Sequence, residues 1–123
     1  MQARQLARRK RKELGQEPPR GYVLSDAFRL WCNLKRGRIT SYMDEKRRLE
    51  RYVISPLGRR QLDEITAPLV IATVRHIEAE GHQATLKRVL MRTREIMDLA
   101  VCAGFITHNP CARVSRVFAA PVV

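Results

Sequence analysis

Residues 83–103 read QATLKRVLMRTREIMDLAVCA, and this segment carries the clearest helical pattern of the chain. Apolar side chains recur along it at intervals of three and four residues, which is the period of an α-helix with one buried face. Gly104 follows directly, and glycine is the residue type that most often ends a helix. The expected apolar face consists of Leu86, Val89, Leu90, Thr93, Ile96, Met97, Ala100 and Val101.

The segments on the N-terminal side of this one predict three more helices. The first is expected to begin at Ser25 as its N-cap, with Asp26 favourable in the first turn, and to end at Gly37. Its apolar face is formed by residues at helical spacing. These are Leu24, Phe28, Trp31 and Cys32.

The second helix is expected from about Thr40 to Val53. The residues 41–44, Ser-Tyr-Met-Asp, fit a capping box at its start. The residues 55–58, Ser-Pro-Leu-Gly, are expected to stop the helix and form a turn. Its apolar side consists of Tyr42, Leu49, Tyr52 and Val53.

The third helix is expected to begin at Thr66 or Ala67, with Pro68 in the first turn, where a missing N–H does no harm. It ends at Gly81, and Val70, Val74 and Ile77 form its apolar stripe. A short last turn or helix runs through Val117, and no segment shows a convincing strand pattern. The chain is therefore predicted to be all-α, a compact bundle of four to five helices over residues 21–117.

Charge is unevenly distributed along the chain. The formal net charge is +12 at pH 7. Residues 1–60 hold 17 Lys and Arg against 6 Asp and Glu, whereas residues 61–123 hold 7 against 6. Residues 1–20 are expected to be a basic arm or helix followed by a linker. A strong and uneven positive field indicates a nucleic-acid partner, because a polyanion is attracted to a concentrated cationic face.

Two of the predicted helices carry a basic face, and these faces are the candidate DNA-binding site. An α-helix fits the major groove of B-DNA, where Arg and Lys pair with phosphates and guanine edges. Thr85 lies at a helix start, where hydroxyls and free N–H groups suit phosphate oxygens. The candidate residues are Lys46, Arg47, Arg48 and Arg51 on the second helix, and Thr85, Lys87, Arg88, Arg92 and Arg94 on the fourth.

These residues are expected to divide into two roles. Arg88 and Arg92 are the candidates for base-edge contact, since they share a face of the longest helix. Phosphate contacts are expected from Arg47, Arg51 and Lys87. The interpretation requires the guanidinium groups of the two helices to point toward one common surface.

The sequence gives no support for autonomous catalysis. His76, His82 and His108 fall in different segments, and no Gly-rich phosphate loop is present. Cys102, His108 and Cys111 lack the close cysteine pair of a zinc site, while Cys32 and Cys102 lie among apolar residues, as buried thiols do. We therefore expect no catalytic residues, metal, cofactor, small-molecule substrate or membrane partner. The expected location is cytoplasmic.

A set of short motifs occurs in a characteristic order and spacing. Together they resemble the core-binding domain of phage-type integrases, which are tyrosine recombinases, and especially the prophage group with P4-like organisation. The similarity covers residues 22–117. The motifs are Phe28 with Trp31, residues 48–53 (RLERYV), 56–58 (PLG) and 62–66 (LDEIT), Gly81, residues 85–89 (TLKRV), Ala100 with 104–106 (GFI), and Asn109-Pro110.

The resemblance implies a SAM-like helical bundle that clamps the core of an attachment site in double-stranded DNA during integration and excision. In the family a catalytic domain follows and supplies an Arg…His-x-x-Arg…Tyr set. None of that set is recognisable here, so residues 118–123 are expected to begin the linker to it. We expect an excised domain of a longer integrase, rather than a truncated prophage remnant, acting in the bacterial nucleoid.

Two other functions stay open from the residues alone. A basic helical domain can bind RNA, and competition between B-form DNA and A-form RNA distinguishes that function. A protein-interaction module is the other alternative, with residues 118–123 as an apolar docking tail. Self-association that is lost when this tail is deleted would favour it.

Overall fold

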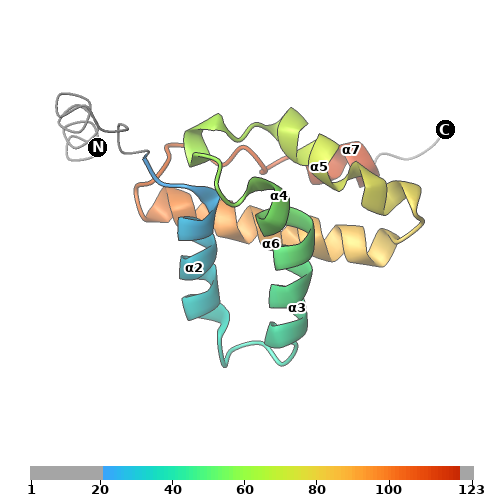
Figure 1. Cartoon of the computed structure of the whole chain (residues 1–123), viewed down its shortest axis with the longest axis horizontal. Coiled ribbons are helices and arrows are strands. Elements are labelled where there is room, and N and C mark those ends of the chain that lie inside the picture. Colours follow the sequence, from blue (N-terminus) through green and yellow to red (C-terminus); the bar gives the residue numbers. More distant parts are fainter. Residues whose placement is uncertain (1–20, 120–123) are drawn as a thin grey trace.

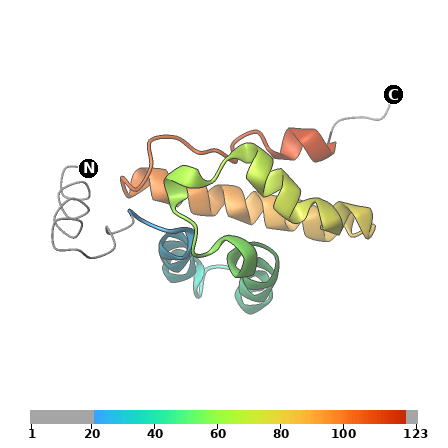
Figure 2. The same ribbon diagram turned by 45° about the horizontal axis from the view of Figure 1, so that its top comes forward.

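The structure, a computed structural model, describes residues 21–119 and is built from helices alone (Figure 1). The longest helix, α6, spans Gln83–Cys102. Helices α2 (Leu24–Lys35) and α3 (Tyr42–Leu49) lie side by side and project from one side of α6, while α5 (Ala67–Ala79) packs along it (Figures 1 and 2). A 3₁₀ turn at Leu62–Glu64 precedes α5, and α7 (Ser115–Ala119) also contacts α6. The predicted all-α bundle is confirmed; the described residues contain one isolated β-bridge, between Val23 and Gln61, and no strand.

The core lies where these helices meet, and the predicted apolar faces fill it. Trp31 of α2 is fully buried and stacks between Phe28 and Tyr42, with ring centroids 5.9 and 6.0 Å away. All residues of the predicted α6 stripe from Leu86 to Ala100 are buried, and Val101 is half-buried. Within residues 21–119, no helix has both the length and the apolar run needed to cross a bilayer.

The start of α2 differs from the prediction. The helix begins at Leu24, with Val23 rather than Ser25 as its N-cap. Asp26 completes the cap, because its carboxylate accepts a hydrogen bond from the Val23 N–H at 2.8 Å. The N–H groups of Leu24 and Ser25 donate to the carbonyls of Arg60 and Gly58, so a distant segment extends the helix beyond its local capping signal.

The second helix begins close to the expected position, but its predicted capping box was wrong. Helix α3 begins at Tyr42, two residues after Thr40, and the hydroxyl of its N-cap, Ser41, makes no capping hydrogen bond. The expected capping box is absent because the Asp44 carboxylate faces the Arg47 guanidinium, 3.9 Å away, instead of the N-cap N–H.

The predicted stop at Pro56 does not occur either. A π-helical turn, Glu50–Ile54, follows α3, and α4 (Ser55–Leu57) follows that turn. The Ser55 N–H donates to the carbonyl of Glu50, five residues back, and regular bonding resumes from Gly58 to Ile54 at 2.7 Å. Proline has no N–H to donate, and the wider turn places Pro56 where the helical segment can continue without that hydrogen bond.

The later elements follow the prediction closely. Helix α5 is capped by Thr66, whose hydroxyl accepts from the Leu69 N–H at 3.3 Å. Gly37, Gly81 and Gly104 all have positive φ and end α2, α5 and α6. Helix α7 continues past Val117 to Ala119, so Phe118 packs against the core.

The two cysteines expected to be buried have different environments. Cys32 is buried, as predicted, but Cys102 is exposed. Cys102 is the last residue of α6 and lies on the outer face, at helical spacing from the exposed residues Met91 and Asp98.

Candidate nucleic-acid interface

A buried carboxylate organises the contact between α3 and α6. Glu45 of α3 is 1% exposed and lies within ion-pair distance of three arginines. Its Oε2 accepts a hydrogen bond from Arg88 Nη1 at 3.2 Å. Its Oε1 is 3.4 Å from Arg48 Nη1 and 3.5 Å from Arg92 Nε, without hydrogen-bond alignment. One carboxylate therefore fixes guanidinium groups from two helices.

A second carboxylate joins α2 to the same cluster. Glu95 Oε1 accepts hydrogen bonds from Trp31 Nε1 at 3.0 Å and from Arg92 Nη1 at 3.1 Å, and lies 3.6 Å from Lys35 Nζ. Burial alone would raise the pKa of this carboxyl, but the hydrogen bonds from Trp31 and Arg92 and the charges of Arg92 and Lys35 outweigh it. The pKa of Glu95 is therefore held below its usual value.

The lowered pKa of Glu95 makes part of the stability dependent on pH. The stabilisation of the folded state by ionised Glu95 is complete at pH values above the pKa of an unfolded glutamate, about 4.3. It is lost as the pH falls through the lower pKa of Glu95 in the folded state. We expect Glu95→Gln to lower the free energy of unfolding at pH 7 by about 1 kcal/mol, since the site is partly exposed. Urea denaturation at pH 7, 5 and 3.5 should show this difference shrinking toward the acid end. The exposed Glu64→Gln is the matched control, and a difference that persists unchanged at pH 3.5 would contradict the assignment.

The outer side of α3 and of the π-helical turn after it carries a separate pair of cations. Arg47 and Arg51 are four residues apart and both exposed. Within residues 21–119 the one ion-pair partner of Arg47 is the exposed Asp44, and Arg51 lies over the Tyr52 ring at 5.1 Å. Lys46 is half-buried. Arg48 was expected on the outer face with them but turns toward Glu45, leaving its side chain 26% exposed.

The cations of α6 divide between two flanks of the helix. Thr85, Arg88 and Arg92 follow one another at helical spacing on the flank that faces α3. Lys87 and Arg94 lie on the other flank, where both line a cavity with Cys111. The single outer face expected for these cations is therefore wrong.

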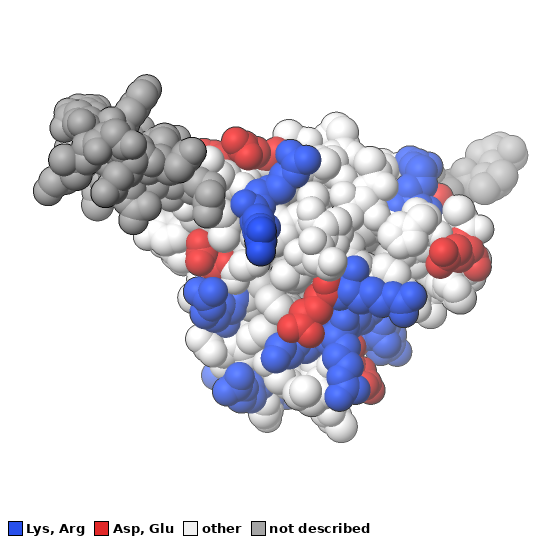
Figure 3. Space-filling model, viewed as in Figure 1, with Lys and Arg blue, Asp and Glu red and all other residues white. Residues whose placement is uncertain are grey.

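Arg92 is the clearest departure from that expectation. Its side chain is only 14% exposed, because Glu45 and Glu95 draw it inward, whereas that of Arg88 remains 55% exposed. The predicted arginines and Lys87 thus fall into three groups. Arg47, Arg51 and the anchored Arg88 are exposed, Arg48 and Arg92 turn inward, and Lys87 and Arg94 lie on the other flank of α6. Figure 3 shows the main gathering of Lys and Arg on this face over α3, beside acidic residues. The four arginines expected to share a surface do not lie at opposite ends of the molecule, since Arg88 and Arg92 share Glu45 with Arg48, the neighbour of Arg47.

Sequence reasoning missed the two carboxylates that organise the cluster. One signal was present: Glu45 falls between Tyr42 and Leu49 on the apolar stripe of α3, where a charged residue needs buried partners. Nothing comparable marked Glu95, whose bond to Trp31 joins residues 64 positions apart.

The described residues offer no group of three or more His, Cys, Asp or Glu side chains arranged to hold a metal ion. Burial, and then the charge of Asp98, raise the pKa of the Cys111 thiol to about 12, so it stays protonated at neutral pH. His76 is an exposed side chain against the Tyr52 ring. What the arrangement offers chemically is a set of positioned cations.

Comparison with known proteins gives two matches to this chain. The family profile described as phage integrase central domain matches residues 24–117. Prophage integrase IntA of Escherichia coli (strain K12) is 30% identical over 93 residues, which cover 74% of this chain and 22% of that protein. No solved structure gives a significant match.

Proposed function

The chain belongs to the phage integrase family, as its central domain, and from that premise we propose that it binds duplex DNA through α3 and the flank of α6 that faces it. The proposed contacts are Arg47 on α3, Arg51 on the π-helical turn that follows it, and Arg88 on α6. Their target in the proposal is the core of an attachment site, clamped during integration and excision in the bacterial nucleoid.

The observation that carries this proposal is the anchoring of three arginines on one buried carboxylate. In the cluster around Glu45 and Glu95, four cations (Lys35, Arg48, Arg88 and Arg92) meet two carboxylates, so two positive charges remain uncompensated. Holding a guanidinium in place before binding lowers the entropy cost of its contact with a phosphate or a base. Arg88 is anchored by Glu45 and its side chain is still 55% exposed, so it is both held in place and accessible to DNA.

Arg47 and Arg51 are proposed as phosphate contacts, because they are exposed and weakly paired. Each phosphate contact contributes about 0.9 to the slope of log K against log salt, or about tenfold in affinity at 0.1 M salt. We expect Arg47→Ala with Arg51→Ala to weaken binding by up to about a hundredfold and to reduce the slope by about 1.8. Fluorescence anisotropy with a labelled duplex over a salt series measures both.

The matched control removes two exposed arginines from other parts of the surface, Arg75→Ala with Arg113→Ala. It loses the same net charge, so the long-range electrostatic effect is common to both variants. Equal losses of affinity in the two double variants would overturn the assignment of Arg47 and Arg51 as phosphate contacts. An A-form RNA duplex that competes as well as B-form DNA would favour an RNA-binding domain instead.

Arg88 is proposed to contact a base edge. Arg88→Ala should then weaken binding to an attachment-site duplex more than to a random duplex, by about 1–3 kcal/mol. Equal losses on both duplexes would make Arg88 a phosphate contact.

The chain spans 22% of the length of its relative. We therefore propose strand exchange only for a protein in which this domain is joined to a catalytic domain. That protein is proposed to be a tyrosine recombinase. The coding sequence after Val123 tests this, because it should contain an Arg…His-x-x-Arg…Tyr set.

A further inference from the structure

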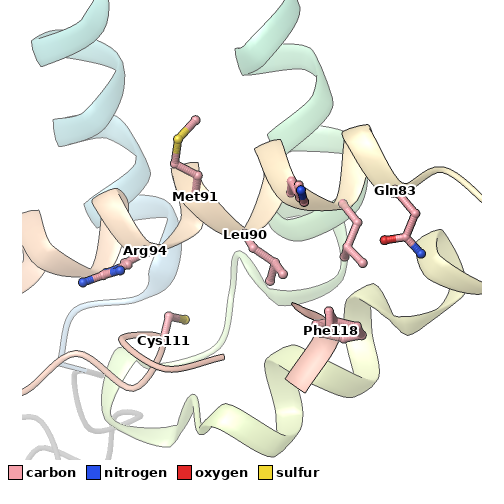
Figure 4. A pocket seen from close by; sticks show the side chains of 8 residues that line it. Gln83, Leu90, Met91, Arg94, Cys111 and Phe118 are labelled. Atoms are coloured by element: carbon pink, nitrogen blue, oxygen red, sulfur yellow. The ribbon is translucent and has the colours of Figure 1, made fainter. Parts of the chain in front are cut away.

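A second surface lies on the opposite flank of α6, where this helix meets α7. It is a cavity of about 300 Å³ whose floor contains Leu86, Leu90, Cys111 and Phe118. Figure 4 shows Gln83 and Arg94 toward its two ends, with Leu90 and Phe118 between them. Two large apolar side chains nearby remain exposed: Met91, which also lines the cavity, at 47%, and Val117 of α7 at 49%.

The rim of this cavity is cationic and unpaired. Lys87 and Arg94 both line it, and neither forms an ion pair with a carboxylate in the part of the chain described. Arg88 and Arg92, on the other flank, are both held by Glu45. The cations of α6 are therefore of two kinds, and only one kind belongs to the proposed DNA surface.

The lining has the geometry of a groove for a helix. Gln83, Lys87, Leu90 and Arg94 recur at intervals of four, three and four residues, so they form one straight stripe along α6. Lys87 and Arg94 are separated by about two turns, or roughly 10 Å along the axis. Leu90 is only 6% exposed, so the apolar lining that such a helix can contact is Met91 and the half-buried Phe118, while its carboxylates can reach both cations.

Charge excludes the other segments of this chain as occupants. Residues 1–20 hold seven Lys and Arg against two Glu, so the cationic rim repels them. Residues 120–123, Ala-Pro-Val-Val, carry no charged side chain to match the rim. A second copy of the chain brings a net charge of +12 to a surface that is itself positive.

We propose that this groove docks an acidic amphipathic helix of a partner protein. Apolar side chains of that helix pack on Met91 and Phe118, and Asp or Glu residues about two turns apart pair with Lys87 and Arg94. Met91 lines the groove, and its flexible thioether adapts to the side chains of the partner. This interaction goes beyond DNA binding and uses a different flank of α6.

The test uses the full chain and a labelled, designed peptide of about 16 residues, roughly four helical turns, with a leucine stripe flanked by glutamates. Fluorescence anisotropy should give a Kd of about 10⁻⁵–10⁻⁴ M, and a lysine-substituted analogue should bind at least about tenfold more weakly. Lys87→Glu with Arg94→Glu should weaken binding of the glutamate peptide by at least about tenfold. If the lysine analogue binds as well as the glutamate peptide, or if the charge reversal has no effect, the proposal is overturned.

A matched control separates this groove from the DNA surface. Arg59→Glu with Arg60→Glu reverses two exposed cations elsewhere, with the same change of net charge. It should leave peptide binding within about twofold of the unaltered chain, and both double variants should lose DNA affinity to a similar extent. A DNA loss about tenfold greater for Lys87→Glu with Arg94→Glu would assign this flank to DNA and overturn the docking groove. Circular dichroism melting curves confirm that each variant is folded.

Discussion

Replacing Glu45 by alanine is expected to lower the free energy of unfolding by about 3–5 kcal/mol. The carboxylate is 1% exposed and is the shared counterion of Arg48, Arg88 and Arg92. Arg88 can turn out to water, since its side chain is already 55% exposed. Arg92, at 14% exposed, cannot do so without moving from between α3 and α6, and Glu95 alone then compensates it. The cost is that of leaving a buried charge with too little compensation.

A loss of this size is a large part of the stability of an ordinary domain, which is about 5–15 kcal/mol. Thermal and urea denaturation followed by circular dichroism measure it. Glu45→Gln keeps the size of the side chain and should lose less, because the amide oxygen still accepts a hydrogen bond from Arg88. Asp44→Ala is the matched control: its carboxylate is 71% exposed and 3.9 Å from Arg47, so the change should cost less than about 0.5 kcal/mol. A similar cost for Asp44→Ala and Glu45→Ala would show that Glu45 does not anchor the arginines.

The apolar pattern predicted the long elements well, and the reason is physical. The stripe of α6 and the face around Trp31 are periodic over several turns, and burial of apolar surface is the dominant force that places such helices. The starts of α2 and α3 were predicted less well. At α2, tertiary contacts replace Ser25 as the local cap. At α3, Ser41 is the N-cap, but its hydroxyl makes no capping hydrogen bond and Asp44 pairs with Arg47 instead. At α2, the carbonyls of Arg60 and Gly58 satisfy the first N–H groups.

The candidate site was predicted only in part. The sequence gives the helix on which each cation lies, but the direction of a long side chain depends on where its counterion lies. Arg48 and Arg92 turn inward because Glu45 lies between them. Arg92 is 44 positions from Arg48 and 47 positions from Glu45 in the chain, so sequence spacing does not indicate this cluster. Lys87 and Arg88 are adjacent in sequence, yet they face different neighbours.

Gly58→Ala is expected to lower the free energy of unfolding by about 2–3 kcal/mol. Gly58 is buried in the right-handed helical conformation, with φ −58° and ψ −29°, so conformational freedom is not the reason for glycine here. Intrinsic preference alone predicts that alanine at such a position stabilises by about 0.4–1 kcal/mol. A Cβ atom at this position would lie 2.5 Å from the Ile54 carbonyl oxygen and 2.7 Å from Ser25 Oγ. The backbone of α4 would have to move away from the start of α2, where Gly58 accepts a hydrogen bond from the Ser25 N–H.

The sign of the change therefore decides between close packing and local preference at this glycine. Gly104→Ala is the matched control: this residue has φ +80° and open space around the missing Cβ. It should lose about 1 kcal/mol, from backbone strain alone. Adding Ser25→Ala to Gly58→Ala removes the hydroxyl contact and should recover only part of the loss, because the contact with the Ile54 carbonyl remains. A stabilised Gly58→Ala protein would mean that α2 and α4 can move apart at no cost. The close contact between Gly58 and the start of α2 would then contribute nothing to the stability of the fold.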